Sequence, residues 1–202
     1  KENPVPEKAT LVDDTSWSCL HGVSRWSGGC SCTPGSEWKH PLRVALNQIA
    51  DWVDGVYLDI VSPLLPDPWE LRHRFVEVMA HQTSLSKLWQ EVGGKTEDFN
   101  DERMTLLMRA QYERQRMYTS CGFFFSDFHR IEPQNNVAYA ANAVWLTKKV
   151  SGTDISPAVL KSLADVRSNN TGLRADTVFL QTLVRAENES GFSESAARTL
   201  SH

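Results

Sequence analysis

The feature that most constrains the fold is a helical repeat of apolar residues, which begins near residue 41 and recurs along most of the chain. The apolar residues of the first such segment are Leu42, Ala45, Leu46, Ile49, Trp52, Val53, Val56, Tyr57 and Ile60. Spacings of three and four place these side chains on one face of an α-helix. Pro41 fits the first position of this helix, and Pro63 and Pro66 end it. The pattern therefore predicts a long amphipathic helix with one buried face.

Five further segments have the same periodicity, and they predict helices over residues 68–89, 101–118, 133–149, 157–166 and 174–187. Asp67 before Pro68 is typical of a helix N-cap, and Asn100 or Asp101 fits the same role. No segment has a convincing strand pattern, since the nearest one, residues 122–125, is too short to build a sheet. The sequence predicts an all-α fold, a helical bundle of about five to six helices.

The chain divides into three parts by composition. Residues 1–40 are interrupted by prolines and glycines and predict a long structured loop that packs on the bundle, while residues 41–189 form the bundle itself. Residues 190–202 are polar and predict a flexible tail. The whole is expected to be one domain, and because it opens at Lys1 rather than Met, we expect a fragment of a larger protein.

Composition excludes several classes of partner. A net charge of −4 leaves no basic face for phosphates, so no nucleic-acid binding is expected. No apolar run approaches the roughly 18 residues of a membrane-spanning helix, and the polar start is not a signal peptide. We therefore expect a cytoplasmic protein without membrane contact, in which the four cysteines are reduced thiols or metal ligands.

The first segment that could carry chemistry contains three of the four cysteines. Cys19, His21, Cys30 and Cys32 form a C-x-H-x8-C-x-C pattern, a ligand set that suits a structural zinc ion. Its spacing is not one of the common zinc patterns, and Cys121 is an alternative fourth ligand. Two other interpretations stay open: small buried thiols that only pack, and a disulfide.

The same loop contains Trp17, Trp26 and Trp38 beside Arg25. Aromatic side chains next to hydrogen-bonding groups suit sugar rings, which have an apolar C–H face and a rim of hydroxyls. Loop tryptophans also serve as plugs that seal a helical bundle, and by count alone this is the better interpretation of the three tryptophans.

The second segment runs from Met117 to Pro133 and joins an aromatic run to Asp127, His129 and Glu132. Two carboxylates near a histidine could perform acid–base chemistry if burial shifted their pKa values. The alternative is structural, with Asp127 capping a turn and Glu132 interacting with a helix N-terminus.

Both segments together resemble the domain of unknown function 3536. The first motif is Thr15-Ser16-Trp17-Ser18-Cys19-x-His21-Gly22, followed by Arg25-Trp26 and Cys30-x-Cys32. The second is residues 118–125, followed by Asp127, by residues 131–133 and by residues 139–141. The resemblance extends from about Asp13 to Val184, and position 123 is Phe where the family pattern has Trp.

This resemblance implies a bacterial, cytoplasmic protein in which the helical region follows a glycoside hydrolase family 57-like barrel upstream of Lys1. Family 57 enzymes act on α-glucans with retention, using two carboxylates carried by the barrel. Neither carboxylate maps onto this chain, so no catalytic residue is assigned and the fragment alone is expected to be inactive. The helical region would wall the saccharide cleft, with Trp17, His21, Arg25, Trp26, Asp127 and Glu132 lining or supporting it.

Overall fold

A computed structural model describes residues 10, 12–13, 15–16 and 18–199, with side chains to Ser190. The elements in chain order are α1 (Ser24–Ser27), α2 (Lys39–Val61), α3 (Pro68–Met79), α4 (Leu85–Glu91), a 3-10 helix (Thr96–Asp98), α5 (Asp101–Arg116), α6 (Cys121–Phe124), α7 (Ile131–Ser151), α8 (Ser156–Leu163) and α9 (Ala175–Thr199). The described residues contain no β-strand, and only an isolated bridge joins Arg167 to Arg174. The predicted all-α class is confirmed.

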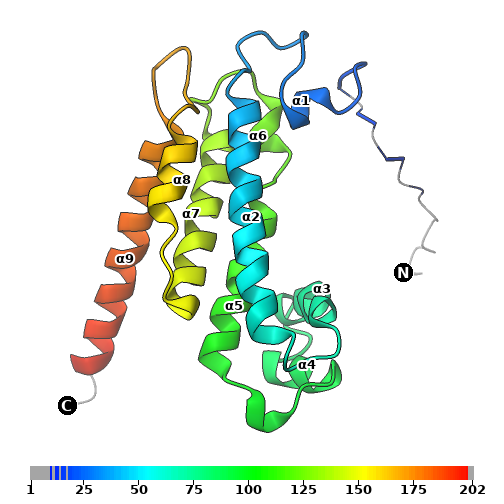
Figure 1. The fold of residues 1–202 in the computed structure, drawn as a ribbon, viewed down its shortest axis with the longest axis vertical. Coiled ribbons are helices and arrows are strands. Elements are labelled where there is room, and N and C mark those ends of the chain that lie inside the picture. The colour runs from blue at the N-terminus through cyan, green and yellow to red at the C-terminus, as the bar shows by residue number, and fades with distance from the viewer. Residues whose placement is uncertain (1–9, 11, 14, 17, 200–202) are drawn as a thin grey trace, which may run out of the picture.

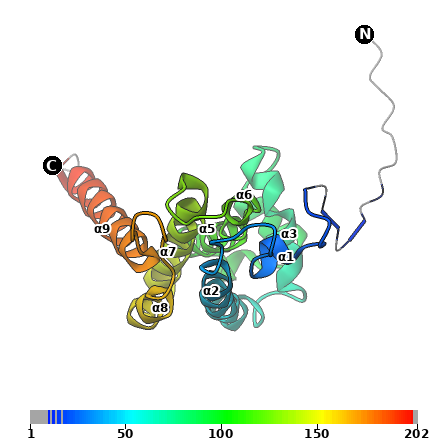
Figure 2. The same ribbon diagram turned by 90° about the horizontal axis from the view of Figure 1, so that it is seen from above.

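The long helices lie along the long axis of the molecule, with α7 at the centre (Figure 1). α7 packs against α2, α5, α6 and α9, while α3 and α4 cover the lower end of α2 and α5. The short helices α1 and α6 lie together at the other end, next to the start of α2 (Figures 1 and 2). The N-terminal loop is thereby held over one end of the bundle.

Two apolar clusters form the core. The larger one fills the space between α2, α7, α8 and α9 and includes Leu46, Val144 and Phe179, all with no exposed surface. The smaller one lies between the end of α2 and helices α3, α4 and α5, around the fully buried Trp89. Burial of an aliphatic or aromatic side chain contributes about 1.5–3 kcal/mol, so both clusters stabilise the bundle strongly.

Two predicted helix starts are confirmed by their caps. The carboxylate of Asp67 accepts a hydrogen bond from the backbone N–H of Trp69 at 2.9 Å, and Pro68 is the first residue of α3. The side chain of Asn100 accepts one from Arg103 N–H at 2.8 Å. Capping of this kind contributes about 1 kcal/mol to stability.

Several boundaries differ from the prediction. The single helix predicted over residues 68–89 is broken, because His81 has a φ of 57° and Ser84 caps a new helix through Lys87 N–H. α2 begins at Lys39, and Pro41 lies in its first turn, where its missing N–H has no helical acceptor. α9 continues to Thr199, past the predicted end near Glu187, so the backbone of residues 190–199 is helical.

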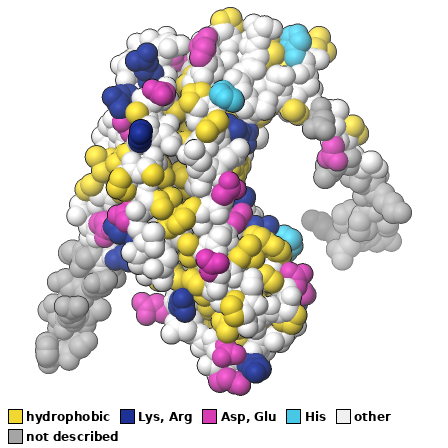
Figure 3. Space-filling view, viewed as in Figure 1, with side chains coloured by type: hydrophobic (Ala, Val, Ile, Leu, Met, Phe, Trp, Pro, Cys, Tyr) yellow, Lys and Arg dark blue, Asp and Glu magenta, His cyan; other side chains and the backbone are white. Residues whose placement is uncertain are grey.

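The surface carries no extended region of one charge on the face drawn in Figure 3, where acidic and basic side chains alternate. Within the described part of the chain, no helix has both the length and the apolar composition needed to cross a bilayer.

Candidate functional site

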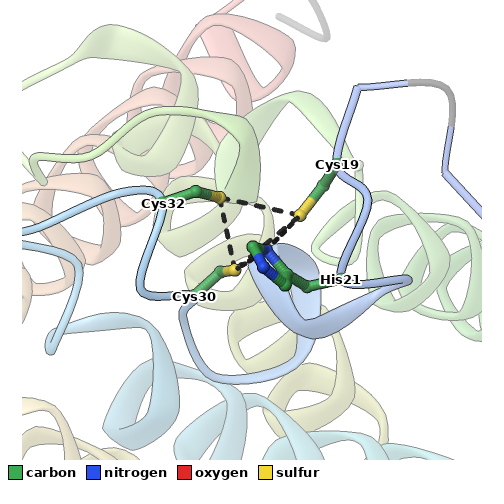
Figure 4. A group of neighbouring side chains, drawn as sticks. All are labelled: Cys19, His21, Cys30 and Cys32. Atoms are coloured by element: carbon green, nitrogen blue, oxygen red, sulfur yellow. Dashed lines mark hydrogen bonds between the residues drawn. The ribbon is translucent and has the colours of Figure 1, made fainter.

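Cys19, His21, Cys30 and Cys32 come together in the N-terminal loop, around helix α1. Cys19 and His21 precede α1, and Cys30 and Cys32 follow it. The chain segments before and after this short helix therefore lie side by side. The four side chains point toward one another, and their ligand atoms all lie within 4.8 Å (Figure 4). The backbone of Gly29, with a φ of 113°, permits the tight return. These four residues could hold a metal ion.

The spacing of the ligand atoms fits a tetrahedral centre. The Cys19 sulfur lies 3.7 Å from that of Cys30 and 3.6 Å from that of Cys32, and the Cys30 and Cys32 sulfurs are 3.2 Å apart. His21 Nδ1 lies 3.7 Å from the Cys19 sulfur and 3.2 Å from the Cys30 sulfur. Thiolates bound at about 2.3 Å to one tetrahedral zinc ion lie about 3.8 Å apart, so small shifts would suffice.

The four cysteines are all free thiols in this structure. The pKa of Cys30 is lowered to about 6, chiefly by hydrogen bonds from the backbone and the thiol of Cys32. Cys30 is therefore poised to act as a thiolate ligand near neutral pH. The alternative ligand Cys121 is exposed, starts α6 and is not part of this cluster in the described structure.

Two cations flank the cluster. Arg25 Nη2 donates a weak hydrogen bond to the Cys32 sulfur at 3.8 Å. Lys39, at the start of α2, has no exposed surface, and among the described residues its Nζ has no hydrogen-bond partner. Burial lowers the pKa of Lys39 to about 8, with a further lowering by Arg25, while Cys32 and Cys30 raise it. The lysine is thus within electrostatic reach of both thiols.

A hollow of about 340 Å³ lies beside the cluster, where α1 meets α6 and the start of α7. Its lining residues are Trp26, Ser120, Cys121, Phe124, Phe125 and Glu132. Three aromatic side chains thus form the walls, and one carboxylate supplies the charge. The hollow joins the two segments singled out in the sequence, because α1 packs against α6 and α6 against α7.

Glu132 lies in the first turn of α7, where a negative charge is favourable. Its Oε2 is buried without a hydrogen-bond partner in the described structure, although Arg130 Nε lies 3.6 Å away. The guanidinium of Arg130 lies 4.6 Å from the centre of the Phe125 ring, and that of Arg25 lies 5.1 Å from the Phe124 ring. The walls of the hollow are therefore backed by cations, and Glu132 has one carboxylate oxygen that accepts no hydrogen bond in the described structure.

Asp127 has a different environment from Glu132. One carboxylate oxygen accepts hydrogen bonds from the backbone N–H and the imidazole of His129, and the other from the N–H groups of Asn169 and Asn170. Burial would raise the pKa of Asp127, but hydrogen bonds from Ser168, His129 and Asn170 outweigh it and lower the pKa to about 2. Asp127 thus closes a local turn with His129 and also joins the loop before α7 to the loop before α9.

The predicted saccharide residues therefore separate into groups. Arg25, Trp26 and Glu132 gather at the hollow, whereas His21 belongs to the cysteine cluster. Trp17 lies outside the described residues. Trp38 is a plug, because it is buried, packs on Phe123 and Phe128, and donates its indole N–H to the backbone oxygen of Ser126 at 2.9 Å.

Sequence reasoning missed Lys39 and the aromatic walls formed by Phe124 and Phe125. In the aromatic run of residues 123–125, only Phe123 is fully buried, because α6 is helical and turns successive rings to different sides. Lys39 had no signal of its own, since a lysine before an amphipathic helix is expected to be solvated.

Comparison with known proteins identifies the helical region. No curated protein and no solved structure matches the chain. A family described as "Domain of unknown function (DUF3536)" matches residues 35–191, more than half of the chain. The match includes the second motif, residues 118–141, and it starts just after Cys32, so the first motif with the cysteine cluster lies outside it. The chain therefore belongs to the DUF3536 family.

Proposed function

We propose that this chain is a saccharide-binding accessory domain of a larger carbohydrate-active protein. The observation that carries the proposal is the hollow, which is lined by Trp26 of the N-terminal loop, by Glu132 of α7 and by the rings of Phe124 and Phe125. Aromatic faces stack on the apolar side of a pyranose, and a carboxylate with unused acceptor capacity receives its hydroxyl groups. A volume near 340 Å³ suits one or two sugar rings.

The parent protein in this proposal is glycoside hydrolase family 57-like, with its barrel upstream of Lys1, and the ligand is an α-glucan or a related saccharide. The resemblance of the two sequence motifs supports this assignment. Among the described residues that line the hollow, only Glu132 has a carboxylate. Retaining glycoside hydrolysis needs two carboxylates about 5 Å apart, so the reaction would belong to the barrel. The compartment in this proposal is the bacterial cytoplasm.

The test is the binding of maltooligosaccharides to the 202-residue chain, measured by calorimetry and by tryptophan fluorescence. We expect saturable binding without hydrolysis, and a loss of affinity of about tenfold, near 1.4 kcal/mol, in Trp26→Ala. Glu132→Gln keeps the shape of the side chain and is expected to weaken binding less. Trp145→Ala, on α7 away from the hollow, serves as the matched control. Equal affinity in wild type and Trp26→Ala would argue against the proposal.

The upstream sequence provides an independent test. A few hundred residues of alternating strand and helix patterns before Lys1, with acidic residues at strand ends, are expected. A native gene product that begins at Lys1 would remove the barrel and leave only the binding domain.

The cysteine cluster supports a second role, that of a metal-stabilised helical module that docks another protein without taking part in catalysis. In either case the metal is zinc, because three thiolates and one imidazole at tetrahedral spacing are typical of structural zinc sites. Four protein ligands leave no open position for catalysis, so the ion would fasten the N-terminal loop.

Elemental analysis of the purified chain tests the metal. One equivalent of zinc is expected in the wild type, and its loss is expected in Cys30→Ser. The exposed Cys121→Ser is the control and should retain it. If the chain binds a partner protein but has no affinity for saccharides, the second role is favoured over the first.

A further inference from the structure

A separate cleft lies between α3 and α5, at the end of the bundle opposite to α1 and α6 (Figure 1). It has a volume of about 290 Å³, and the residues that line it all belong to these two helices. Its apolar walls are supplied by Phe75, Met79, Met108 and Tyr112. Val76, which also lines it, is 62% exposed, and Met79 is 42% exposed. The cleft is therefore apolar, open to solvent and near the lower end of the size range of small-molecule sites.

The charged groups at the α3–α5 cleft leave an excess of positive charge. Arg72 lines the cleft, whereas none of the described residues that line it is acidic. The carboxylate of Asp54 on α2 is shared between two cations: its Oδ2 accepts a hydrogen bond from Arg114 Nη2 at 2.7 Å, and its Oδ1 lies 3.9 Å from Arg72 Nη1. One carboxylate thus serves two guanidinium groups, and Arg72 has the longer contact. This charge balance favours an anionic ligand.

The guanidinium group of Arg72 is held in place before any ligand arrives. Its central carbon lies 4.1 Å from the centre of the Trp69 ring, and its Nη2 lies 3.3 Å from His73 Nε2. Its Nε has no hydrogen-bond partner in the described structure. A planar guanidinium that is already stacked on a ring loses little freedom when it binds a carboxylate, and its donors match the two carboxylate oxygens.

Gln111 adds a requirement for a hydrogen-bond donor. Its side chain lines the cleft but is only 1% exposed, and its Nε2 donates to Asp54 Oδ1 at 3.1 Å and to the backbone oxygen of Val53 at 3.4 Å. These two acceptors fix the orientation of the amide, and its Oε1 is left buried without a partner in the described structure. A buried acceptor without a donor is unfavourable, and an N–H or O–H group of a ligand in the cleft would satisfy it.

We propose that the α3–α5 cleft binds a small monocarboxylate with an apolar side chain and a neutral hydrogen-bond donor beside the carboxylate, as in 2-hydroxy acids and N-acylated amino acids. Arg72 binds the carboxylate, and Gln111 accepts a hydrogen bond from the neutral donor. Phe75, Met79 and Met108 cover the apolar side chain, and the flexible methionines adapt to its shape. The cleft shares no lining residue with the hollow at α1 and α6, so this inference and the saccharide proposal stand or fall separately.

The experiment titrates the full chain with 3-phenyllactate and measures binding by calorimetry and by the amide chemical shifts of α3 and α5. We expect one site with a dissociation constant of about 100 µM. Three analogues change one group each: 3-phenylpropionate lacks the hydroxyl, 3-phenyllactamide lacks the charge, and phenylalanine has an ammonium group in place of the hydroxyl. Each is expected to bind about tenfold more weakly. An acetylated tetrapeptide that ends in phenylalanine distinguishes the sources: tighter binding than that of 3-phenyllactate identifies a peptide C-terminus, and weaker binding identifies a free acid.

Two variants locate the binding in the cleft. Arg72→Gln removes the charge and is expected to weaken binding of 3-phenyllactate about tenfold or more. Gln111→Met keeps the approximate shape of the side chain, and it should weaken binding of 3-phenyllactate but not of 3-phenylpropionate. Arg103→Gln, at an exposed position in the first turn of α5, is the matched control and should bind as the wild type does.

The proposal is overturned if 3-phenyllactate does not bind, if folded Arg72→Gln binds it with unchanged affinity, or if 3-phenyllactate and 3-phenyllactamide bind equally. If neither variant folds, the series of analogues on the wild type decides, since each analogue removes one of the groups that the cleft is inferred to recognise.

Discussion

The four N–H groups that surround Asp127 allow a sharp test of a single residue. Each oxygen of its carboxylate accepts two hydrogen bonds, which hold together the loops that precede α7 and α9. An amide at this position turns one acceptor into a donor that faces N–H groups. We expect Asp127→Asn to lower the free energy of unfolding by about 2 kcal/mol at pH 7, measured by urea denaturation.

The pH dependence of this effect follows from the pKa of Asp127, which is lowered to about 2 from 3.8. A carboxylate with a depressed pKa stabilises the folded state fully above its unfolded value, and the stabilisation is lost as the pH falls through the folded value. The difference between wild type and variant should therefore be constant above pH 5 and shrink between pH 4 and pH 2. Asp59→Asn, on an exposed position of α2, is the control. A difference that grows on acidification would contradict this role.

Residue roles were predictable from the sequence where they depend on neighbours in the chain. The caps Asp67 and Asn100 are local, and so is the turn that Asp127 makes with His129. Other features depend on contacts between residues that are far apart in the sequence, and no local pattern encodes such contacts. These features are the hydrogen bonds that Asn169 and Asn170 donate to Asp127, and the burial of Lys39.

At the scale of elements, α6 packs closely on α7 beside the hollow. A Cβ added to Gly122 would lie 2.3 Å from the side-chain nitrogen of Asn136, which is buried and donates to the backbone oxygen of Thr119. Gly122→Ala must therefore separate the two helices or break that bond. We expect a loss of about 1–3 kcal/mol in the free energy of unfolding, measured by thermal or urea denaturation.

Gly55→Ala is the control for this prediction. Gly55 lies inside α2, and beyond its chain neighbours and the nearby backbone of the helix no atom lies within 4 Å of an added Cβ, so the methyl group meets no obstacle. Alanine loses less backbone entropy than glycine on helix formation, and a gain of about 0.5–1 kcal/mol is expected. Equal effects of the two substitutions would show that close packing at Gly122 does not matter.

The sequence predicted the long helices because their apolar periodicity extends over three or more turns. It missed the break between α3 and α4, since Leu88 and Trp89 continue the apolar pattern across it and are buried. It also missed α1 and α6, which have four residues each and are too short to have a period. These two short helices bring the two halves of the hollow together.

For the whole molecule, the decisive feature is that two adjacent residues of the N-terminal loop connect the cysteine cluster with the hollow. Arg25 contacts the Cys32 sulfur and the Phe124 ring, and the next residue, Trp26, lines the hollow while its backbone oxygen accepts a hydrogen bond from Arg43. The sequence placed these residues on one loop, but their distance from Glu132 was set by the fold. A metal that fixes the loop would also fix one wall of the hollow.

Metal and saccharide binding should therefore be coupled. Removal of the metal with a chelator is expected to release the loop and to weaken saccharide binding about fivefold or more, as measured by calorimetry on chelated and reconstituted chain. Because coupling is reciprocal, saturating saccharide must raise metal affinity by the same factor. The coupling should disappear in Trp26→Ala, which retains the metal ligands. If the metal-free protein binds saccharide with full affinity, the packing of α1 against α6 holds this wall of the hollow in place without the ion.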